Sequence, residues 1–253
     1  MCRARILAAS SSYDPGLMSW APILAVDRVE VALDGITRTT LDCAEARLDI
    51  PLFLAYRGLP EAAIDRLNRL SRTADALYSM RRFALFDGLA GLGWVVEHLA
   101  RMLGFDATDL NTDTDAALLG ELESGAWRGT LDWATGLAGL AVYFRERLPL
   151  PAALRGLELV NAHLAGRTVP FPRIEGPAWR AHELNRVWQG VADTGTREQA
   201  VRELETALQA PADRHGFPGG ATVTGLVLLA ASSPVEPAWD RILGMSQLPY
   251  LPE

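Results

Sequence analysis

The chain has few of the residues that build disulfide or metal frameworks. Its 253 residues include only two cysteines, Cys2 and Cys43, and four histidines. Two cysteines do not indicate a disulfide scaffold. The histidines are scattered and form no His-x-x-x-His pair, so the sequence predicts no internal zinc site and no other cofactor. They are His98, His163, His182 and His215.

An excess of basic residues and long apolar runs are also absent. The chain has 24 Lys and Arg against 31 Asp and Glu, for a net charge of −7, and so lacks the basic footprint of a nucleic-acid-binding protein. No apolar run approaches the length of a membrane-spanning helix, and the apolar part of residues 1–9 is too short for a signal peptide. We expect a cytoplasmic globular protein that binds neither nucleic acid nor membrane.

What the chain does contain is an internal repeat. The segment Phe86–Trp94 reads Phe-Asp-Gly-Leu-Ala-Gly-Leu-Gly-Trp and returns in similar form as Ala134–Val142. The shared Gly-Leu-Ala-Gly begins at Gly88 and again at Gly136, 48 residues later. Repeated units of this size bury their apolar faces against one another, so the repeat bears directly on the architecture.

Two weaker copies flank the clear ones. His215–Gly219 precedes an apolar run at residues 225–229, and Leu41–Ala46, which lacks both glycines, precedes Ile50–Tyr56. The expected glycine-opened starts are therefore Gly88, Gly136 and Gly216. The sequence indicates four units, two clear and two eroded.

Helical spacing follows the glycines. Leu92, Val96 and Leu99 form one apolar stripe, and Glu97 and Arg101 are expected to form an exposed ion pair one helical turn apart. We therefore predict an all-α fold, a partial α/α toroid of about four helical hairpins in which the Gly-x-x-Gly motifs open the inner helices. Further predicted helices are Glu61–Tyr78, Pro151–Leu164 and Arg197–Gln209.

The two ends of the chain fit no repeat. We predict an N-terminal extension over residues 1–38, helical repeats over 39–232 and a C-terminal tail over 233–253. Within the extension, Val26–Leu33 is consistent with a short strand before an Asp-Gly turn. The proline-rich stretch Val169–Pro177 indicates a connecting loop.

The residues around the glycines resemble those of one family. Leu85–Leu99 resembles the second repeat of LanC-type lanthipeptide cyclases, and Thr130–Gly139 with Tyr143–Pro149 is similar to the third. Arg214–Gly219 looks like the fourth motif, and Pro51–Tyr56 like the tail of the first. The resemblance covers roughly residues 40–232 and is most specific in the middle two repeats.

The resemblance implies a fold and a chemistry. LanC-type enzymes are toroids of inner and outer helices that close thioether rings in a dehydrated precursor peptide. Their zinc is held by two cysteines and a histidine in later repeats, which this sequence does not include. By position, the resemblance implies acid–base roles for Asp132 and His215.

Each candidate site residue also has a plainer interpretation. His215 is suited to act as a general base near neutral pH, or it caps or packs at a helix start. Asp132 and Asp87 either serve the site or cap the helices that follow them. Trp94 and Trp133 either line a peptide groove or pack in the core and at its rim.

Three functions follow as hypotheses. The preferred one is a truncated, zinc-free LanC-like protein that binds a ribosomally synthesised precursor peptide during its modification, in company with modification enzymes. The first alternative is a metal-independent peptide cyclase that uses His215 and Asp132. The second is a structural half-ring partner of another modification enzyme. Because an unclosed set of hairpins exposes apolar ends, we also expect a homodimer.

Overall fold

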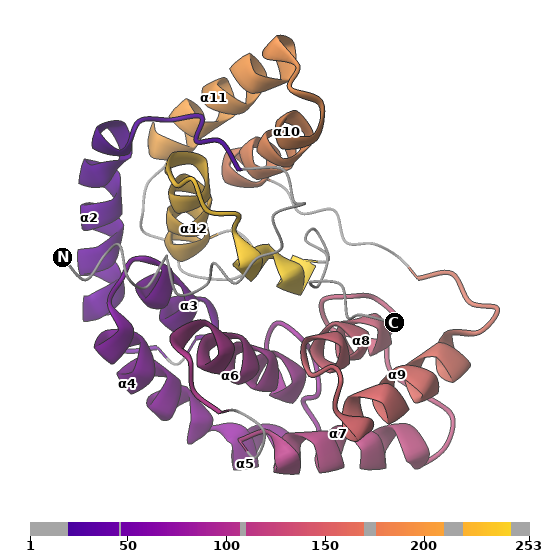
Figure 1. The fold of residues 1–253 in the computed structure, drawn as a ribbon. Helices are drawn as coiled ribbons and strands as arrows, with labels where there is room; N and C mark the ends of the chain where they lie inside the picture. The colour runs from indigo at the N-terminus through magenta and orange to yellow at the C-terminus, as the bar shows by residue number, and fades with distance from the viewer. Residues whose placement is uncertain (1–19, 46, 107–109, 170–175, 210–219, 244–253) are drawn as a thin grey trace. The chain divides into compact units, whose positions relative to one another are not determined.

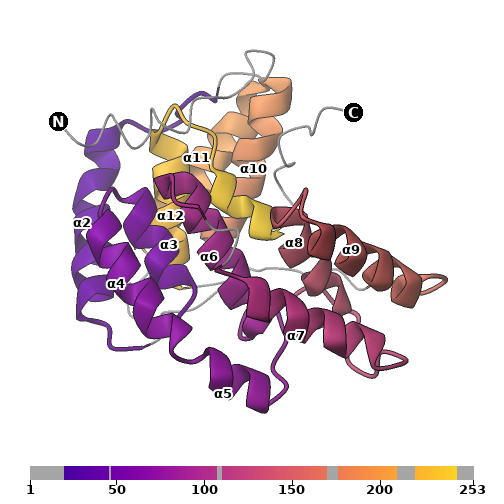
Figure 2. The same ribbon diagram turned by 60° about the horizontal axis from the view of Figure 1, so that its bottom comes forward.

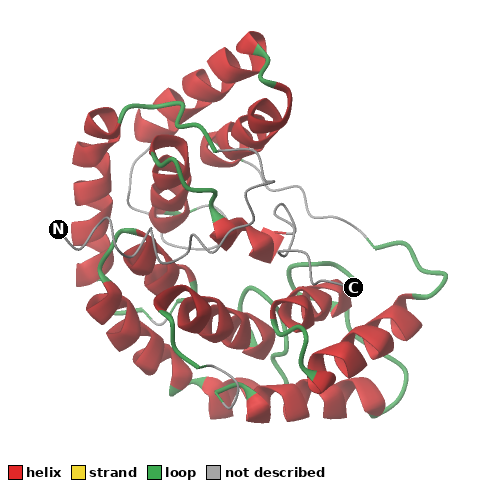
Figure 3. Cartoon of the chain, in the orientation of Figure 1, coloured by secondary structure: helices red, strands yellow, loops and turns green. Residues whose placement is uncertain are grey.

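The computed structural model describes residues 20–45, 47–106, 110–169, 176–209 and 220–243. These residues form helices and no strand (Figure 3), so the expectation of an all-α protein is confirmed for this part of the chain. Within the same ranges, no helix has both the length and the apolar character needed to cross a membrane.

The prediction of a strand near the N-terminus is wrong. Val26–Asp42 forms one helix, α2, which runs through the expected boundary at residue 38. Its buried residues Val29, Leu33 and Ile36 recur at spacings of four and three, which is the period of a helix face. The predicted turn at Gly35 does not form. Gly35 lies within helix α2, and nothing lies within 4 Å of its β position.

The chain divides into two compact units, each built from two separate stretches. Unit 1 comprises Met1–Ile64 and Arg173–Pro237, and unit 2 comprises Asp65–Pro172 and Ala238–Glu253. The helices of unit 1 are α2, α3 (Asp49–Tyr56), α10 (Pro177–Val191), α11 (Thr194–Gln209) and α12 (Ala221–Ser232). The helices of unit 2 are α5 (Ala74–Ser79), α6 (Leu89–Leu103), α7 (Thr112–Glu123), α8 (Leu137–Glu146), α9 (Pro151–Leu164) and the 3₁₀-helix η1 (Ala238–Leu243). Helix α4 (Pro60–Ser71) crosses the boundary.

In unit 1, the apolar helix α12 is the common neighbour of the others. It packs against α2, α3, α10 and α11, and α10 and α11 lie side by side (Figures 1 and 2). The segment before α2 is tied to the end of α12 by main-chain acceptors. Trp20 Nε1 donates to the carbonyl of Ala230 at 2.8 Å, and the Ile23 amide donates to that of Ala231 at 2.8 Å.

In unit 2, α6 packs against α8 and α7, while α9 contacts both α7 and α8 (Figure 2). The 3₁₀-helix η1 returns from far along the chain and contacts α8. Pro151–Leu164 coincides with its prediction, and Arg197–Gln209 is α11 with an earlier start at Thr194. The predicted helix Glu61–Tyr78 is divided into α4 and α5, and α7 and α10 were not predicted.

Candidate functional site

The two clear glycine repeats form loops with the same main-chain hydrogen bond. Before α6, the Leu89 amide donates to the carbonyl of Arg82 at 2.9 Å. Before α8, the Leu137 amide donates to the carbonyl of Thr130 at 3.0 Å. Both donors and both acceptors are 48 residues apart, so the sequence repeat is also a repeat of local structure.

Close main-chain approach explains the glycine at each N-cap. A β carbon at Gly88 would lie 2.7 Å from the carbonyl oxygens of Arg82 and Ala84. At Gly136 it would lie 2.6 Å from the carbonyl carbon of Thr130. Both glycines have extended backbones, so it is the missing side chain, not a left-handed conformation, that the loops require.

The two loops lie next to each other. The Phe86 amide in the first donates to the carbonyl of Ala134 in the second at 3.1 Å. The rings of Phe86 and Trp133 meet edge to face with centroids 5.1 Å apart, and Trp133 is buried. Trp133 therefore packs between the loops, which corresponds to the plainer of its two interpretations.

Asp132 receives hydrogen bonds within its own loop. Its Oδ1 accepts from the Thr135 amide and its Oδ2 from the Thr135 hydroxyl, both at 2.8 Å. Partial burial alone would raise the pKa of Asp132, but the hydrogen bonds from Thr135 and Thr130 outweigh it and hold the pKa below its ordinary value. The carboxylate is therefore ionised near neutral pH and acts as an acceptor that fixes the turn before α8.

The surroundings of the other candidate residues differ from those of Asp132. Asp87 is exposed and paired with Arg82. Trp94 is fully buried in α6 and stacks on His98 with ring centroids 4.6 Å apart, so it belongs to the core of unit 2. His215 and the expected start at Gly216 lie outside the described residues, and the N-cap of α12 is Gly220.

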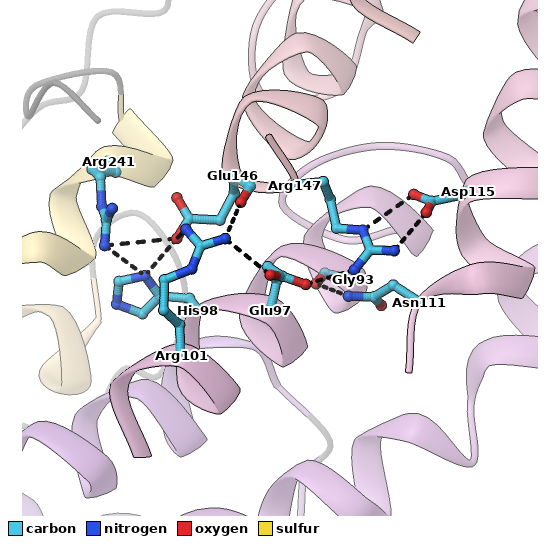
Figure 4. Close-up of polar contacts among 9 residues, drawn as sticks. All are labelled: Gly93, Glu97, His98, Arg101, Asn111, Asp115, Glu146, Arg147 and Arg241. Carbon is cyan, nitrogen blue, oxygen red and sulfur yellow. Dashed lines mark hydrogen bonds and ion pairs between the residues drawn. The ribbon is translucent and has the colours of Figure 1, made fainter. Parts of the chain in front are cut away.

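Unit 2 contains a chain of charged side chains, here called the ionic row, that was not predicted from the sequence (Figure 4). Its six members alternate in sign along the row, from η1 at one end to α7 at the other. They are Arg241, Glu146, Arg101, Glu97, Arg147 and Asp115.

Arg147, at the C-cap of α8, holds the inner end of the row. Its side chain is only 1% exposed, and its Nη1 lies 2.7 Å from Glu97 Oε2 while its Nη2 lies 2.6 Å from Asp115 Oδ2. The Tyr143 hydroxyl donates to Asp115 Oδ1 at 2.5 Å. Burial and the Asp115 carboxylate raise the pKa of Tyr143, so this hydroxyl remains a donor. One arginine thus connects α6, α7 and α8.

Arg101 continues the row on the other side of Glu97. Its Nη2 donates to Glu97 Oε1 at 2.9 Å and to the main-chain carbonyl of Glu146 at 2.6 Å. The expected pair between Glu97 and Arg101 therefore exists, but the expectation that it is exposed is wrong for Glu97, which is buried. The carboxylate faces α8 because Arg147 occupies its other oxygen.

At the outer end, a histidine and a glutamate meet in the core. His98 Nδ1 lies 3.2 Å from Glu146 Oε1, and both side chains are at most 2% exposed. Burial lowers the pKa of His98 and outweighs the opposing effect of Glu146. Burial would raise the pKa of Glu146, but His98, Arg241 and Arg101 hold it below its ordinary value. Both pKa shifts are consistent with an ionised Glu146 carboxylate beside a neutral His98 imidazole.

The row balances three carboxylates with three guanidinium groups, so its members stabilise one another's charges. Such an arrangement fixes how α6, α7, α8 and η1 pack.

Among the described residues, no group of three or more His, Cys, Asp or Glu side chains could hold a metal ion. Comparisons of the chain with protein-family models, with curated proteins and with solved structures found no match.

Proposed function

We propose that this chain is a zinc-free LanC-like protein that binds a ribosomally synthesised precursor peptide while other enzymes modify it in the cytoplasm. The observation that carries the proposal is the recurrence of one loop geometry at the two glycine motifs that resemble the LanC repeats. The same main-chain hydrogen bond and the same close approach at glycine occur before α6 and before α8. Two short stretches that were similar only by chance would not be expected to share both the hydrogen bond and the close approach.

The corresponding architecture is part of the proposal. In unit 2, α6 and α8 are assigned as inner helices of a partial α/α toroid, with α7 and α9 as their outer partners. Helix-to-helix contacts support this pairing, since α6 contacts α8 and α9 contacts both α7 and α8. In unit 1, α12 and α3 are assigned the inner positions because the two helices contact each other.

The charge state of Asp132 favours binding over catalysis. A general base works best when its pKa lies near the pH of the reaction, and hydrogen bonds move the pKa of Asp132 away from neutrality. The ionised carboxylate and the exposed side chains of Asp87 and Thr135 instead offer acceptors to amide or cationic groups of a peptide. The metal-independent cyclase would therefore depend on His215 for proton transfer.

Peptide titration tests the proposal. Isothermal titration of the full chain with its cognate precursor peptide should give saturable binding. Asp132→Ala should weaken that binding by up to about tenfold, which corresponds to ~1.4 kcal/mol. Glu123→Ala, at the exposed end of α7, serves as the matched control and should bind as the wild type does. Absence of binding to the wild type would remove the functional claim.

A thiol-trapping assay separates binder from cyclase. When a thiol adds to a dehydroamino acid of the same peptide, the mass of the peptide does not change. Ring closure is therefore detected as the loss of reactivity toward a thiol-alkylating reagent. Incubation with the dehydrated peptide should leave its thiols reactive. Loss of reactivity that His215→Ala abolishes would establish the cyclase instead. Binding only after addition of a modification enzyme would support the half-ring partner.

Homodimer formation is proposed alongside peptide binding. Among the described residues, several large apolar side chains are more than half exposed, including Val31 on α2 and Val191 on α10. Size-exclusion chromatography with light scattering should give twice the chain mass at micromolar concentration. A monomer at that concentration would contradict the proposed dimer and would not affect the test of peptide binding.

A further inference from the structure

The 3₁₀-helix η1 is held in unit 2 by the packing of its side chains and not by the intrinsic stability of the helix. It has six residues, and a 3₁₀-helix this short has little intrinsic stability. Trp239, Ile242 and Leu243 are each about 1% exposed, and η1 contacts α8. Its position therefore depends on apolar packing and on whatever polar contact orients it.

Arg241 makes one polar contact between η1 and α8, and it is the loosest cation of the ionic row (Figure 4). Its Nη2 lies 3.6 Å from Glu146 Oε1 and 3.5 Å from His98 Nδ1. By contrast, Arg147 reaches its two carboxylates at 2.6 and 2.7 Å. A change in charge beside Glu146 would therefore affect Arg241 first.

His98 is the group whose charge can change there. Facing it are Glu146 from α8, Arg241 from η1 and Arg101 from its own helix, and its ring stacks on Trp94. A neutral imidazole leaves Glu146 Oε1 facing two cations, Arg101 and Arg241. A protonated imidazole places a third positive charge beside the same oxygen, and its Nδ1 lies 3.5 Å from the Arg241 guanidinium.

We propose that η1 is a proton-sensitive clasp: uptake of a proton by His98 displaces Arg241 from Glu146 and loosens η1 from α8. The clasp is independent of the peptide-binding proposal, since His98, Glu146 and Arg241 are not among the candidate peptide contacts. Its parts are one titratable ring, one shared carboxylate oxygen and the one cation contributed by the returning segment.

Thermodynamic linkage gives the direction of the effect. The docked state keeps the pKa of His98 below its ordinary value of 6.5, chiefly because the ring is buried. Loosening η1 admits water and moves Arg241 away, and both changes raise this pKa. Because the loosened state binds the proton more tightly, low pH favours it. Docking is therefore at full strength above pH 6.5 and weakens as the pH falls below that value.

Hydrogen–deuterium exchange of the full chain tests the clasp. Exchange of peptides covering residues 238–243 is compared at about pH 7.5 and about pH 5.5, after correction for the intrinsic exchange rate. We expect protection of η1 to fall at the lower pH, by up to about tenfold for each unit by which docking lowers the pKa of His98. Peptides from α9 should keep their protection. Equal protection of η1 at both pH values would overturn the proposal.

A matched pair of histidine variants identifies the proton acceptor. His98→Gln should abolish the difference between the two pH values in η1. His163→Gln is the control, because His163 lies in the same unit on α9, with its Nε2 2.9 Å from the carbonyl of Leu122. This variant should keep the wild-type response. A response that survives His98→Gln, or that disappears in His163→Gln, contradicts the assignment.

A titration covers the case in which His98→Gln does not fold. The imidazole resonances of His98 are followed by NMR in the wild type and in Arg241→Gln. Removing the guanidinium should raise the pKa of His98, because one of its neighbouring cations is lost and η1 is held less firmly. An unchanged pKa would show that Arg241 and His98 are not coupled, and the clasp would be withdrawn.

Discussion

The central helices of the two units differ in the polar contacts that join them to their neighbours. In unit 1, α12 carries no charged residue: its end is held by main-chain carbonyls that accept from the segment before α2, and its Thr222 hydroxyl donates to Asp49 of α3. In unit 2, the corresponding joints are ion pairs, with Arg147 and Arg101 each reaching partners on neighbouring helices. Main-chain contacts require only that the backbone be in place, whereas buried charges also require particular side chains.

Apolar packing, in contrast, is the same in both units. A β carbon at Gly225 of α12 would lie 2.8 Å from Phe53 Cδ2 of α3. A β carbon at Gly93 of α6 would lie 2.6 Å from Tyr143 Cε2 of α8. In each unit an aromatic ring therefore occupies the space that a glycine leaves on the neighbouring helix. The comparison teaches that ring-on-glycine packing is the shared element and that the polar contacts were specified separately.

The largest expected effect comes from removing the centre of the ionic row. Arg147→Ala leaves Glu97 and Asp115 buried without their common partner, which should lower the free energy of unfolding by about 3–5 kcal/mol. Arg155→Ala is the control, because Arg155 pairs with Glu123 at the surface, and the loss there should be at most about 1 kcal/mol. Chemical denaturation followed by circular dichroism measures both. Equal losses would mean that the row contributes no more than a surface pair.

The shared packing is tested at the two glycines. Gly225→Ala in unit 1 and Gly93→Ala in unit 2 should each cost about 1–3 kcal/mol, because the added methyl group overlaps an aromatic ring. Gly120→Ala on α7 is the control, since nothing lies within 4 Å of its β position. That substitution should stabilise the protein by up to about 1 kcal/mol through helix propensity. A loss in only one unit, seen by thermal unfolding, would end the parallel between them.

The smallest expected effect concerns the loop before α8. Asp132→Ala should cost about 1 kcal/mol because Thr135 loses its acceptor, and Asp132→Asn should cost less because an amide oxygen still accepts. The folded state lowers the pKa of Asp132, so its contribution is present above the ordinary value of 3.8 and is lost as the pH falls through the lowered pKa. Unfolding curves of wild type and Asp132→Ala should therefore converge in acid. A constant difference would assign the cost to packing.

Local patterns predicted the parts of the fold that depend on local rules. The all-α class and the bounds of α9 followed from apolar spacing. The need for glycine before α6 and α8 followed from the repeat itself. The strand proposed at Val26–Leu33 was wrong because a glycine was interpreted as a turn, although the apolar spacing already had the helical period.

The ionic row could not be read from the sequence in the same way. Its members are scattered from Glu97 to Arg241, and no motif or fixed spacing relates them. The one local signal was the pair of Glu97 and Arg101, whose helical spacing is equally common on exposed surfaces. Burial of Glu97 depends on Arg147, fifty residues later, so only the tertiary structure distinguishes the two cases.

The discontinuous build of unit 1 has a consequence for protein synthesis. Leu52, Phe53 and Leu54 of α3 are fully buried, and α12, which packs on α3, begins only at Ala221. At about 5–20 residues per second, the ribosome makes α12 on the order of ten seconds after α3. Helices α6 to α9 are consecutive and can pair in that interval. The nascent chain therefore carries an uncovered apolar helix while its middle is already folded, and α3 is the segment on which a chaperone would be expected to act.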